Sequence, residues 1–348
     1  MKTYKKIISL SLAALMFLML CAACSMPELP EFPGRSNDSA TPREPVNRDN
    51  TTPSGGDITI DTPPESIPLA QPPAIPIILT PVASGTRVEQ NNQAIIDYSN
   101  AADGYVMVKW LTSTDKQLRV QVTGPTGVVY TYIIFPDNTF NVLPLSDGSG
   151  SYEVRVFEQN NTGKFSLILS KNLSANLVDE FAPFLRPNKF VNFDENSKVV
   201  IKASELVGGK KTLTDVIAAI YDFVISNFTY DTDFAQQVIA GGQKGYIPDL
   251  DSVLERRKGI CFDYAAVMTA MLRSQGVPTK MVFGYADDVY HAWISVFSED
   301  TGWIDQVIFF DGENWTMMDP TFAAAAGSSS NLQAFVGTGG IYTVTELY

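Results

Sequence analysis

The stretch RKGICFDYA, residues 257–265, decides how the C-terminal half of this chain is expected to fold. It leads into CFDYAAVMTAMLRSQGVP, residues 261–278, whose apolar residues recur at the spacing of one helix face. That face is expected to hold Cys261, Ala265, Met268 and Leu272. Gly276 can take the left-handed conformation that follows a helix, and Pro278 cannot continue one. The pattern therefore predicts a helix that begins at Cys261.

Cys261 is the only cysteine after residue 24, because the chain has three cysteines and the other two are Cys21 and Cys24. A thiol in the first turn of a helix lies near unpaired backbone N–H groups and the positive end of the helix dipole. Both favour the thiolate, which is the reactive form. The alternative is a small buried apolar residue, a common role for cysteine. Position alone leaves both roles open.

His291 is the only histidine in the chain. It lies in YHAWISVF, residues 290–297, a run typical of a β-strand, where a histidine can also be purely structural. A base that activates the thiol would have to be His291, and a third group should orient its imidazole. Asp319, in MMDPTF, lies at the edge of the next expected strand and precedes Pro320, which ends ladder pairing. A turn residue before proline is the alternative role for Asp319.

The composition limits the classes of function. With 348 residues and 45% apolar residues, the chain is long enough for two domains with packed cores. Its net charge of −13 at pH 7 argues against binding to nucleic acid. One histidine and one distant cysteine cannot build a zinc site, and the carboxylates lack the spacing of a calcium loop. No metal and no cofactor are expected, and no G-x-S-x-G motif indicates a serine hydrolase.

The sequence of the N-terminus is typical of a targeting segment. MKTYKK is basic, an apolar run follows, and CAAC ends it, so residues 1–23 are predicted to be a signal peptide. CAAC resembles a bacterial lipobox, which would make Cys24 the lipidated first residue of an extracytoplasmic protein anchored to the cell membrane. Cys21 stands where a lipobox has an aliphatic residue, and ordinary secretion is the alternative. Residues 24–74, rich in Pro and Ser, are predicted to be a disordered tether.

Residues 75–174 are predicted to form an antiparallel, immunoglobulin-like β-sandwich. Their apolar residues alternate in short runs, and turn signals separate these runs at intervals of about ten residues. The runs are YVMVKWL, QLRVQVTG, VVYTYIIF, YEVRVFE and KFSLILS, and the separators are GPTG, PDN and SDGSG. SDGSG, residues 146–150, is expected to be a hairpin turn. The sandwich could be a spacer or a module that binds carbohydrate or another partner.

The pattern changes to helices and strands after residue 175. A helix is expected over 212–228, with Thr214 as its N-cap and one apolar stripe. A polar, Gly-rich stretch follows at 229–249, and then a short amphipathic piece at 252–258. Strand-like runs complete the chain at 279–286, 290–298, 303–310, 315–322 and 341–347.

The segments GICFDYA, YHAWISV and WTMMDPTF, in this order and at these separations, resemble the transglutaminase-like superfamily over about residues 180–348. The resemblance implies that Cys261 is the nucleophile, His291 the general base and acid, and Asp319 the orienting carboxylate. It also matches Gly259, Asp263, Tyr264 and Trp293 to positions that shape the site.

The resemblance implies an α+β protein whose residues 175–348 form a papain-like, transglutaminase-like catalytic domain. A thiolate would attack an amide carbonyl and form a thioester, with the backbone N–H of Cys261 as the first oxyanion donor. Tyr230 and Trp293 are candidates for oxyanion or substrate contacts. Hydrolysis of peptide, protein or peptidoglycan-peptide substrates is favoured over cross-linking. The alternative function is a non-catalytic cell-surface binding protein that keeps this fold.

Overall fold

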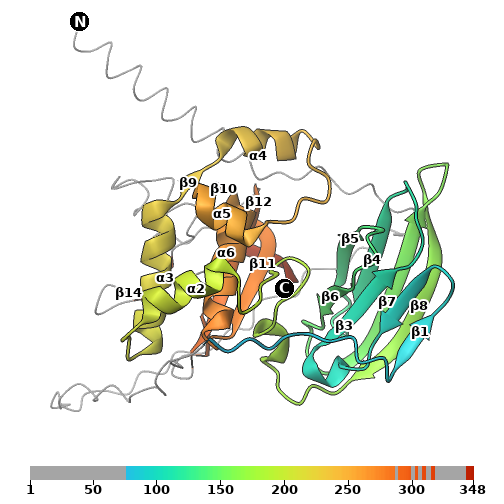
Figure 1. Cartoon of the computed structure of the whole chain (residues 1–348), viewed down its shortest axis with the longest axis horizontal. Helices are drawn as coiled ribbons and strands as arrows, with labels where there is room; N and C mark the ends of the chain where they lie inside the picture. The colour runs from blue at the N-terminus through green and yellow to red at the C-terminus, as the bar shows by residue number, and fades with distance from the viewer. Residues whose placement is uncertain (1–75, 287–288, 299–301, 305–307, 311–314, 318–341) are drawn as a thin grey trace, which may run out of the picture.

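The computed structural model describes residues 76–286, 289–298, 302–304, 308–310, 315–317 and 342–348. The chain is an α+β protein in which antiparallel sheets precede a helical region with strands of its own (Figure 1). This confirms the predicted fold class. The helices and the sandwich lie on opposite sides of the molecule, with β11 and α6 on the side of the helical region nearer the sandwich.

The N-terminal part is built from two four-stranded antiparallel sheets. Their strands are β1 Val88–Gln90, β2 Ala94–Asp97, β3 Tyr105–Trp110, β4 Leu118–Thr123, β5 Val129–Ile134, β6 Asn141–Pro144, β7 Gly150–Gln159 and β8 Phe165–Ala175. One sheet has the order β1-β2-β3-β6 and the other β5-β4-β7-β8. Alternation along β7 buries Tyr152, Val154 and Val156 and leaves the residues between them half-buried, as the sequence predicts. A 3₁₀ turn, η1 Ala101–Asp103, precedes β3.

The segment 146–150 is not a hairpin turn, so this prediction was wrong. β6 and β7 belong to different sheets, and the segment between them crosses from one sheet to the other. Asp147 holds this crossing in place. Its carboxylate accepts hydrogen bonds from the hydroxyl groups of Thr126, in the turn between β4 and β5, and Tyr130, on β5. Gly and Asp therefore mark a turn here without pairing the strands that flank it.

The helical region contains five α-helices and one 3₁₀ turn among the described residues. They are η2 Ala182–Phe184, α2 Lys198–Val207, α3 Leu213–Asn227, α4 Thr232–Ile239, α5 Leu250–Arg256 and α6 Cys261–Ser274. Its strands are β9 Thr229–Tyr230, β10 Lys258–Gly259, β11 Thr279–Ala286, β12 Val289–Ser298, β13 Gly302–Ile304, β14 Ile308–Phe310, β15 Trp315–Met317 and β16 Tyr342–Leu347. The main sheet has the order β13-β12-β11-β16.

Two details of the helices differ from the sequence predictions. The N-cap of α3 is Thr212, whose hydroxyl accepts a hydrogen bond from the Asp215 N–H at 3.1 Å; residue 214, the predicted cap, lies inside the first turn. The polar stretch 229–249 contains α4, which the sequence analysis missed. Asp231 caps that helix by accepting from the Phe234 N–H at 3.1 Å.

Helix α6 is buried along its whole length. All fourteen of its residues are buried, although the sequence predicts a single buried face. The helices α2, α3 and α5 pack around it, and β11 and β12 cover another side. Gly276 follows the helix with a φ of +76°, as predicted. Helix α6 is therefore the central element of this part of the chain.

The sandwich and the helical region share one continuous core. Tyr348 lies at their junction, with its ring centre 5.6 Å from that of Tyr130 and 5.6 Å from that of Tyr132, both on β5. Phe190, on the segment that joins the two parts, stacks on Tyr132 and lies edge-on to Phe262 of α6. Aromatic packing therefore connects the sandwich to the first turn of α6.

Arg273 joins the end of α6 to three other segments. Its guanidinium is fully buried and donates hydrogen bonds of 2.7 to 2.9 Å to the backbone carbonyls of Thr279, Arg186 and Tyr348. Burial lowers the pKa of Arg273 to about 9. Since its partners are carbonyl groups, a neutral side chain in its place would leave buried acceptors unpaired.

Replacement of this residue tests that role. We expect Arg273→Met to lower the free energy of unfolding by about 3 kcal/mol or more, because at least two buried carbonyl groups lose their donors. Denaturant unfolding followed by circular dichroism measures the change. The matched control is Arg155→Met, which removes a side chain that is 32% exposed and whose Nε lies 3.5 Å from the Glu153 carboxylate; it should change stability by less than about 1 kcal/mol. Equal losses in the two variants would contradict this role for Arg273.

Candidate active site

Cys261 is the first residue of α6, as the sequence predicts. Ile260 before it has an extended backbone, and only 7% of Cys261 is exposed. The thiol therefore lies at the N-terminal end of the helix, where the positive end of the helix dipole is found. A negative charge that forms on Cys261 would be stabilised at this position.

Asp263 holds the start of α6 in place. Its carboxylate is fully buried and accepts a hydrogen bond from the backbone N–H of Ile260 at 2.8 Å. It also accepts from the hydroxyl of Tyr246 and from the guanidinium of Arg256, the latter at 3.2 Å. Burial raises the pKa of Asp263, and these hydrogen bonds and the charge of Arg256 oppose the rise. Asp263 therefore caps the helix from within.

Gly259 has no side chain, and the side chain of Asp263 fills the space that one would need. A Cβ atom at position 259 would lie 2.5 Å from the Cβ of Asp263 and 2.8 Å from its carboxylate carbon, far inside contact distance. The close approach of the Asp263 side chain to the backbone of Gly259 therefore requires glycine at this position.

Tyr230 lies beside the start of α6. β9 pairs in parallel with β10, which places Tyr230 opposite Gly259, two residues before Cys261. The Asp231 N–H donates to the Gly259 carbonyl at 2.9 Å and fixes this register. The structure thus brings Tyr230 close to Cys261, the predicted nucleophile, and the role of Tyr230 as an oxyanion donor stays a prediction.

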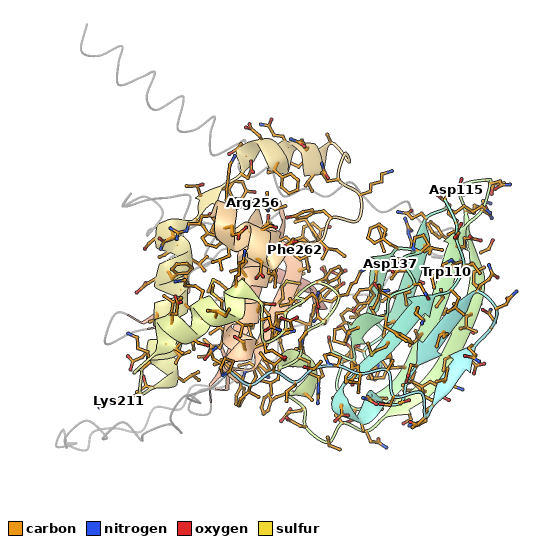
Figure 2. All side chains as sticks on the ribbon, viewed as in Figure 1. Trp110, Asp115, Asp137, Lys211, Arg256 and Phe262 are labelled. Carbon is orange, nitrogen blue, oxygen red and sulfur yellow. The ribbon has the colours of Figure 1, made fainter. Side chains whose placement is uncertain are left out.

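The start of β12 lies next to the first turn of α6. Phe262, which follows Cys261, contacts Phe283 of β11, with ring centres 5.0 Å apart. Phe283 in turn stacks on Tyr290, which precedes His291 on β12. Helix α6, which carries Cys261, and strand β12, which carries His291, are therefore neighbours in the fold. Phe262, the residue after Cys261, is labelled in Figure 2.

His291 and Trp293 lie on the same face of β12. Both are buried, and their rings are roughly parallel with centres 6.3 Å apart. Gly284 pairs with His291 across the sheet and leaves room for the indole: a Cβ there would lie 2.7 Å from the Trp293 ring and 2.0 Å from the carbonyl of Thr343. Trp293 thus packs beside the imidazole, and its predicted role in shaping the site or contacting substrate stays a prediction.

Two predicted site residues lie outside the described residues. Asp319, the predicted orienting carboxylate, is one, and Cys24, the predicted lipidation site, is the other. The structure therefore places Cys261, His291, Tyr230 and Trp293, and the roles of Asp319 and Cys24 remain predictions.

The sequence analysis missed the two partners of Asp263. Tyr246 comes from a segment read as a polar loop, and Arg256 from the last turn of α5. Only the folding of the chain brings these two side chains to Asp263, because they lie on other segments. Burial and the carboxylate of Asp263 raise the pKa of Tyr246, so its hydroxyl remains a donor at neutral pH.

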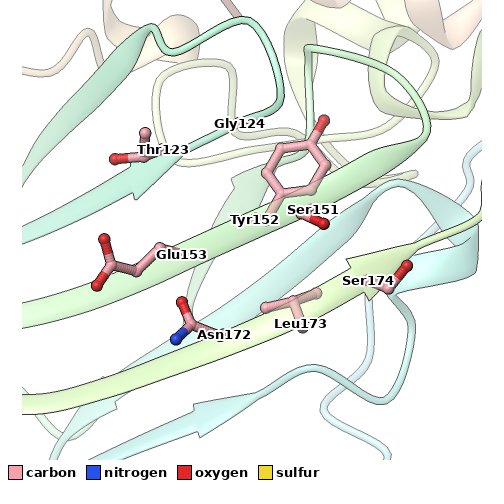
Figure 3. A pocket seen from close by; sticks show the side chains of 8 residues that line it. All are labelled: Thr123, Gly124, Ser151, Tyr152, Glu153, Asn172, Leu173 and Ser174. Carbon is pink, nitrogen blue, oxygen red and sulfur yellow. The ribbon is translucent and has the colours of Figure 1, made fainter.

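The described residues also form a hollow that lies away from α6. It has a volume of about 530 Å³ and crosses the ends of β4, β7 and β8 in the sandwich (Figure 3). It is lined by Thr123, Gly124, Ser151, Tyr152, Glu153, Asn172, Leu173 and Ser174. Since all of these belong to the sandwich, the hollow contributes nothing to the region around Cys261. In the described ranges no three His, Cys, Asp or Glu side chains gather to bind a metal ion.

Comparison with known proteins gives a match to one family model over part of the chain. Residues 202–306, which include Cys261 and His291, match the family model described as Transglut_core: Transglutaminase-like superfamily. An uncharacterized protein of Bacillus subtilis (strain 168), YebA, is 26% identical over 121 residues, which cover 29% of this chain and 16% of that protein. The chain therefore spans a small part of this relative's length.

Solved structures resemble the chain distantly. A proposed cysteine protease from Cytophaga hutchinsonii has 15% identity and a TM-score of 0.35, covering 76% of this chain and 74% of that chain. The transglutaminase of red sea bream has 13% identity and a TM-score of 0.22, covering 73% of this chain and 55% of that chain.

The close packing at Gly259 gives a direct test of the helix start. We expect Gly259→Ala to destabilise the protein by about 1–3 kcal/mol, since the new methyl group displaces Asp263 and with it the first turn of α6. The rate of thiol alkylation at Cys261 should change as well. Thermal unfolding and iodoacetamide labelling measure the two effects.

The control is Gly208→Ala, at the end of α2. A Cβ there meets nothing closer than 3.5 Å, so stability should stay unchanged or rise by up to about 1 kcal/mol. A Gly259→Ala protein that matches this control in both measurements would show that the tight packing does not position Cys261.

Proposed function

We propose that the protein is a thiol enzyme that acts on amide bonds through Cys261, His291 and Asp319. The observation that carries this proposal is the position of Cys261 as the first residue of a helix buried on all sides, next to the strand that bears His291. The transglutaminase-like match over residues 202–306 supports the same pairing. Asp319 enters only through the resemblance of the segment WTMMDPTF to the superfamily.

In the proposed reaction, the imidazolium of His291 and the helix end stabilise the Cys261 thiolate, which attacks the carbonyl carbon of an amide. The carbonyl oxygen takes up the negative charge, and the backbone N–H of Cys261 donates a hydrogen bond to it. The tetrahedral intermediate then collapses to a thioester, and the C–N bond breaks as His291 protonates the departing amine. A water molecule, deprotonated by the now neutral His291, attacks the thioester carbonyl; the C–S bond breaks, the carboxylic acid leaves, and the thiolate–imidazolium pair is restored.

Hydrolysis is the proposed outcome in preference to cross-linking, because water is the acceptor that every solvent-connected thioester meets. The proposed substrates are peptides, surface proteins or the peptide parts of peptidoglycan. This choice follows the proposed location of the protein outside the cytoplasm, with its lipid on Cys24 and its tether at 24–74. In the described part of the chain, no helix has the length and apolar character needed to span a bilayer.

Alkylation of Cys261 across a range of pH tests the catalytic pair. We expect iodoacetamide to label the mature protein nearly as fast at pH 5.5 as at pH 8, because a thiol paired with an imidazolium stays ionised far below the ordinary cysteine pKa of about 8.5. In His291→Ala, labelling at pH 5.5 should fall at least about tenfold, since the thiol then regains its proton. Mass spectrometry of the labelled peptide gives both rates.

Two further variants complete this test. Cys261→Ala should remove the label, and Asp319→Asn should give an intermediate rate at low pH, because an imidazole without its carboxylate is a weaker partner. Slow labelling of the wild type that rises with pH, equal in His291→Ala, would contradict catalysis and favour a surface protein that binds without turnover.

The anchor is tested separately. We expect bacterial cells that express the full chain and are fed an alkyne-tagged fatty acid to yield labelled protein in the membrane fraction, and Cys24→Ala to yield unlabelled protein. Cys21→Ala is the matched control and should keep the label. Label that persists in Cys24→Ala, or is absent from the wild type, would overturn the proposed lipidation.

A further inference from the structure

The sheet β5-β4-β7-β8 has an outer face that points away from the core of the sandwich. Residues that lie directly opposite each other in an antiparallel pair point to the same face. The register therefore places Ile133, Arg119, Phe157 and Leu167 side by side on this face, one on each strand. Phe165, two residues before Leu167 on β8, faces the same way. These five residues are called the Arg119 row below.

The Arg119 row is where apolar side chains gather on this face. Leu167, at the edge strand β8, is 54% exposed. The neighbouring rows are mostly polar, and one of them borders the hollow of Figure 3. Their residues are Thr131, Gln121, Arg155 and Ser170, and Val129, Thr123, Glu153 and Asn172.

Arg119 is a cation without a carboxylate partner. Its Cζ lies 3.9 Å from the ring centre of Phe165, and its Nη2 donates to the Oε1 of Gln117, a neutral partner, at 3.4 Å. The ion pairs in the described part of the chain do not include it. Partial burial lowers the pKa of Arg119, yet the guanidinium stays charged at neutral pH. Arg119 is thus a partly dehydrated charge that a bound carboxylate would compensate.

The charges on the outer face favour an anionic partner. Along the four strands, the register turns Arg119, Arg155 and Glu153 outward. The Nε of Arg155 lies 3.5 Å from the Glu153 carboxylate, so these two charges offset each other. Arg119 then leaves this face with a net charge of +1, in a chain whose net charge is −13. A carboxylate finds a locally positive surface here.

We propose that the Arg119 row binds an extended peptide segment with an Asp or Glu side chain followed two residues later by an apolar side chain. A guanidinium held by a stacked ring presents its N–H groups to a carboxylate in a fixed geometry. The strand spacing puts Phe157 about 5 Å and Leu167 about 10 Å from Arg119. Side chains two residues apart in an extended peptide are about 7 Å apart, so the apolar one would lie between Phe157 and Leu167.

The row ends beside the loop that precedes α5. A Cβ at Gly245 would lie 3.3 Å from the Cγ2 of Ile133, so the loop packs on the last residue of the row. Tyr246, the next residue, donates to the Asp263 carboxylate in the first turn of α6. A peptide that crosses the row from Leu167 to Ile133 would therefore end close to the candidate active site. Its binding does not require the thiol chemistry, so the two proposals can fail separately.

Two blocked peptides test the proposal. Acetyl-Ala-Glu-Ala-Leu-Ala-amide and the same peptide with Gln in place of Glu are titrated into the mature chain by calorimetry and NMR. The protein carries Cys261→Ala, so that turnover cannot obscure binding. We expect the Glu peptide to bind with a dissociation constant in the millimolar range or tighter. The Gln peptide should bind at least about fivefold more weakly, because it lacks the carboxylate.

A variant of the row should remove this preference. In Arg119→Gln, both peptides should bind equally weakly, since the discriminating cation is gone. The matched control is Arg87→Gln. Arg87 also lies over an aromatic ring, with its Cζ 4.9 Å from the ring centre of Tyr98, but it precedes β1 in the other sheet. The control changes the net charge by the same amount and should keep the fivefold preference.

Leu167→Ser tests the apolar contact without changing a charge. It should weaken binding of the Glu peptide about threefold and leave binding of a peptide with Ala in place of Leu unchanged. If circular dichroism shows that Arg119→Gln does not fold, this variant and the Gln peptide decide. No binding of the Glu peptide, equal binding of the Glu and Gln peptides to the unaltered row, or loss of the preference in Arg87→Gln would each overturn the proposal.

Discussion

Everything in the C-terminal half depends on the burial of helix α6. A helix enclosed along all fourteen residues cannot slide or rotate without breaking contacts with α2, α3, α5 and the sheet. Its N-terminal N–H groups are then buried too, and they need acceptors in the protein. Asp263 meets part of this requirement from inside the helix, and Gly259 leaves room for it. Burial and capping together fix the position of Cys261.

The capping arrangement also shapes the electrostatics of the site. A carboxylate two residues after Cys261 opposes a thiolate, and its fully buried position would make the repulsion strong. Tyr246 and Arg256 both donate to Asp263 and spread its negative charge away from the helix axis. The helix start therefore keeps its cap while the positive potential of its N–H groups remains available to Cys261.

Local signals predicted some of these features and could not predict others. The helix at Cys261 follows from apolar spacing and from Gly276, which act within one segment. The partners of Asp263 come from two other segments, and nothing near residue 246 or 256 marks them in the sequence. The loop at 146–150 was misread for a related reason, because turn residues show that a strand ends and not which sheet the next strand joins. Helix α4 was missed because Gly residues follow a short apolar face.

The shared core bears on whether the sandwich is only a spacer. A sandwich that acted only as a spacer would not need to pack its core against the helical region. Here Tyr130 and Tyr132 pack on Tyr348, and Phe190 connects them to Phe262 beside Cys261. The backbone N–H of Lys189 also donates to the carbonyl of Val142 on β6 at 2.9 Å. Moving the sandwich would expose this aromatic layer to water, at a cost of about 25 cal/mol for each Å² of apolar surface. The sandwich is therefore packed against the first turn of α6 through this aromatic layer, which a simple spacer would not need.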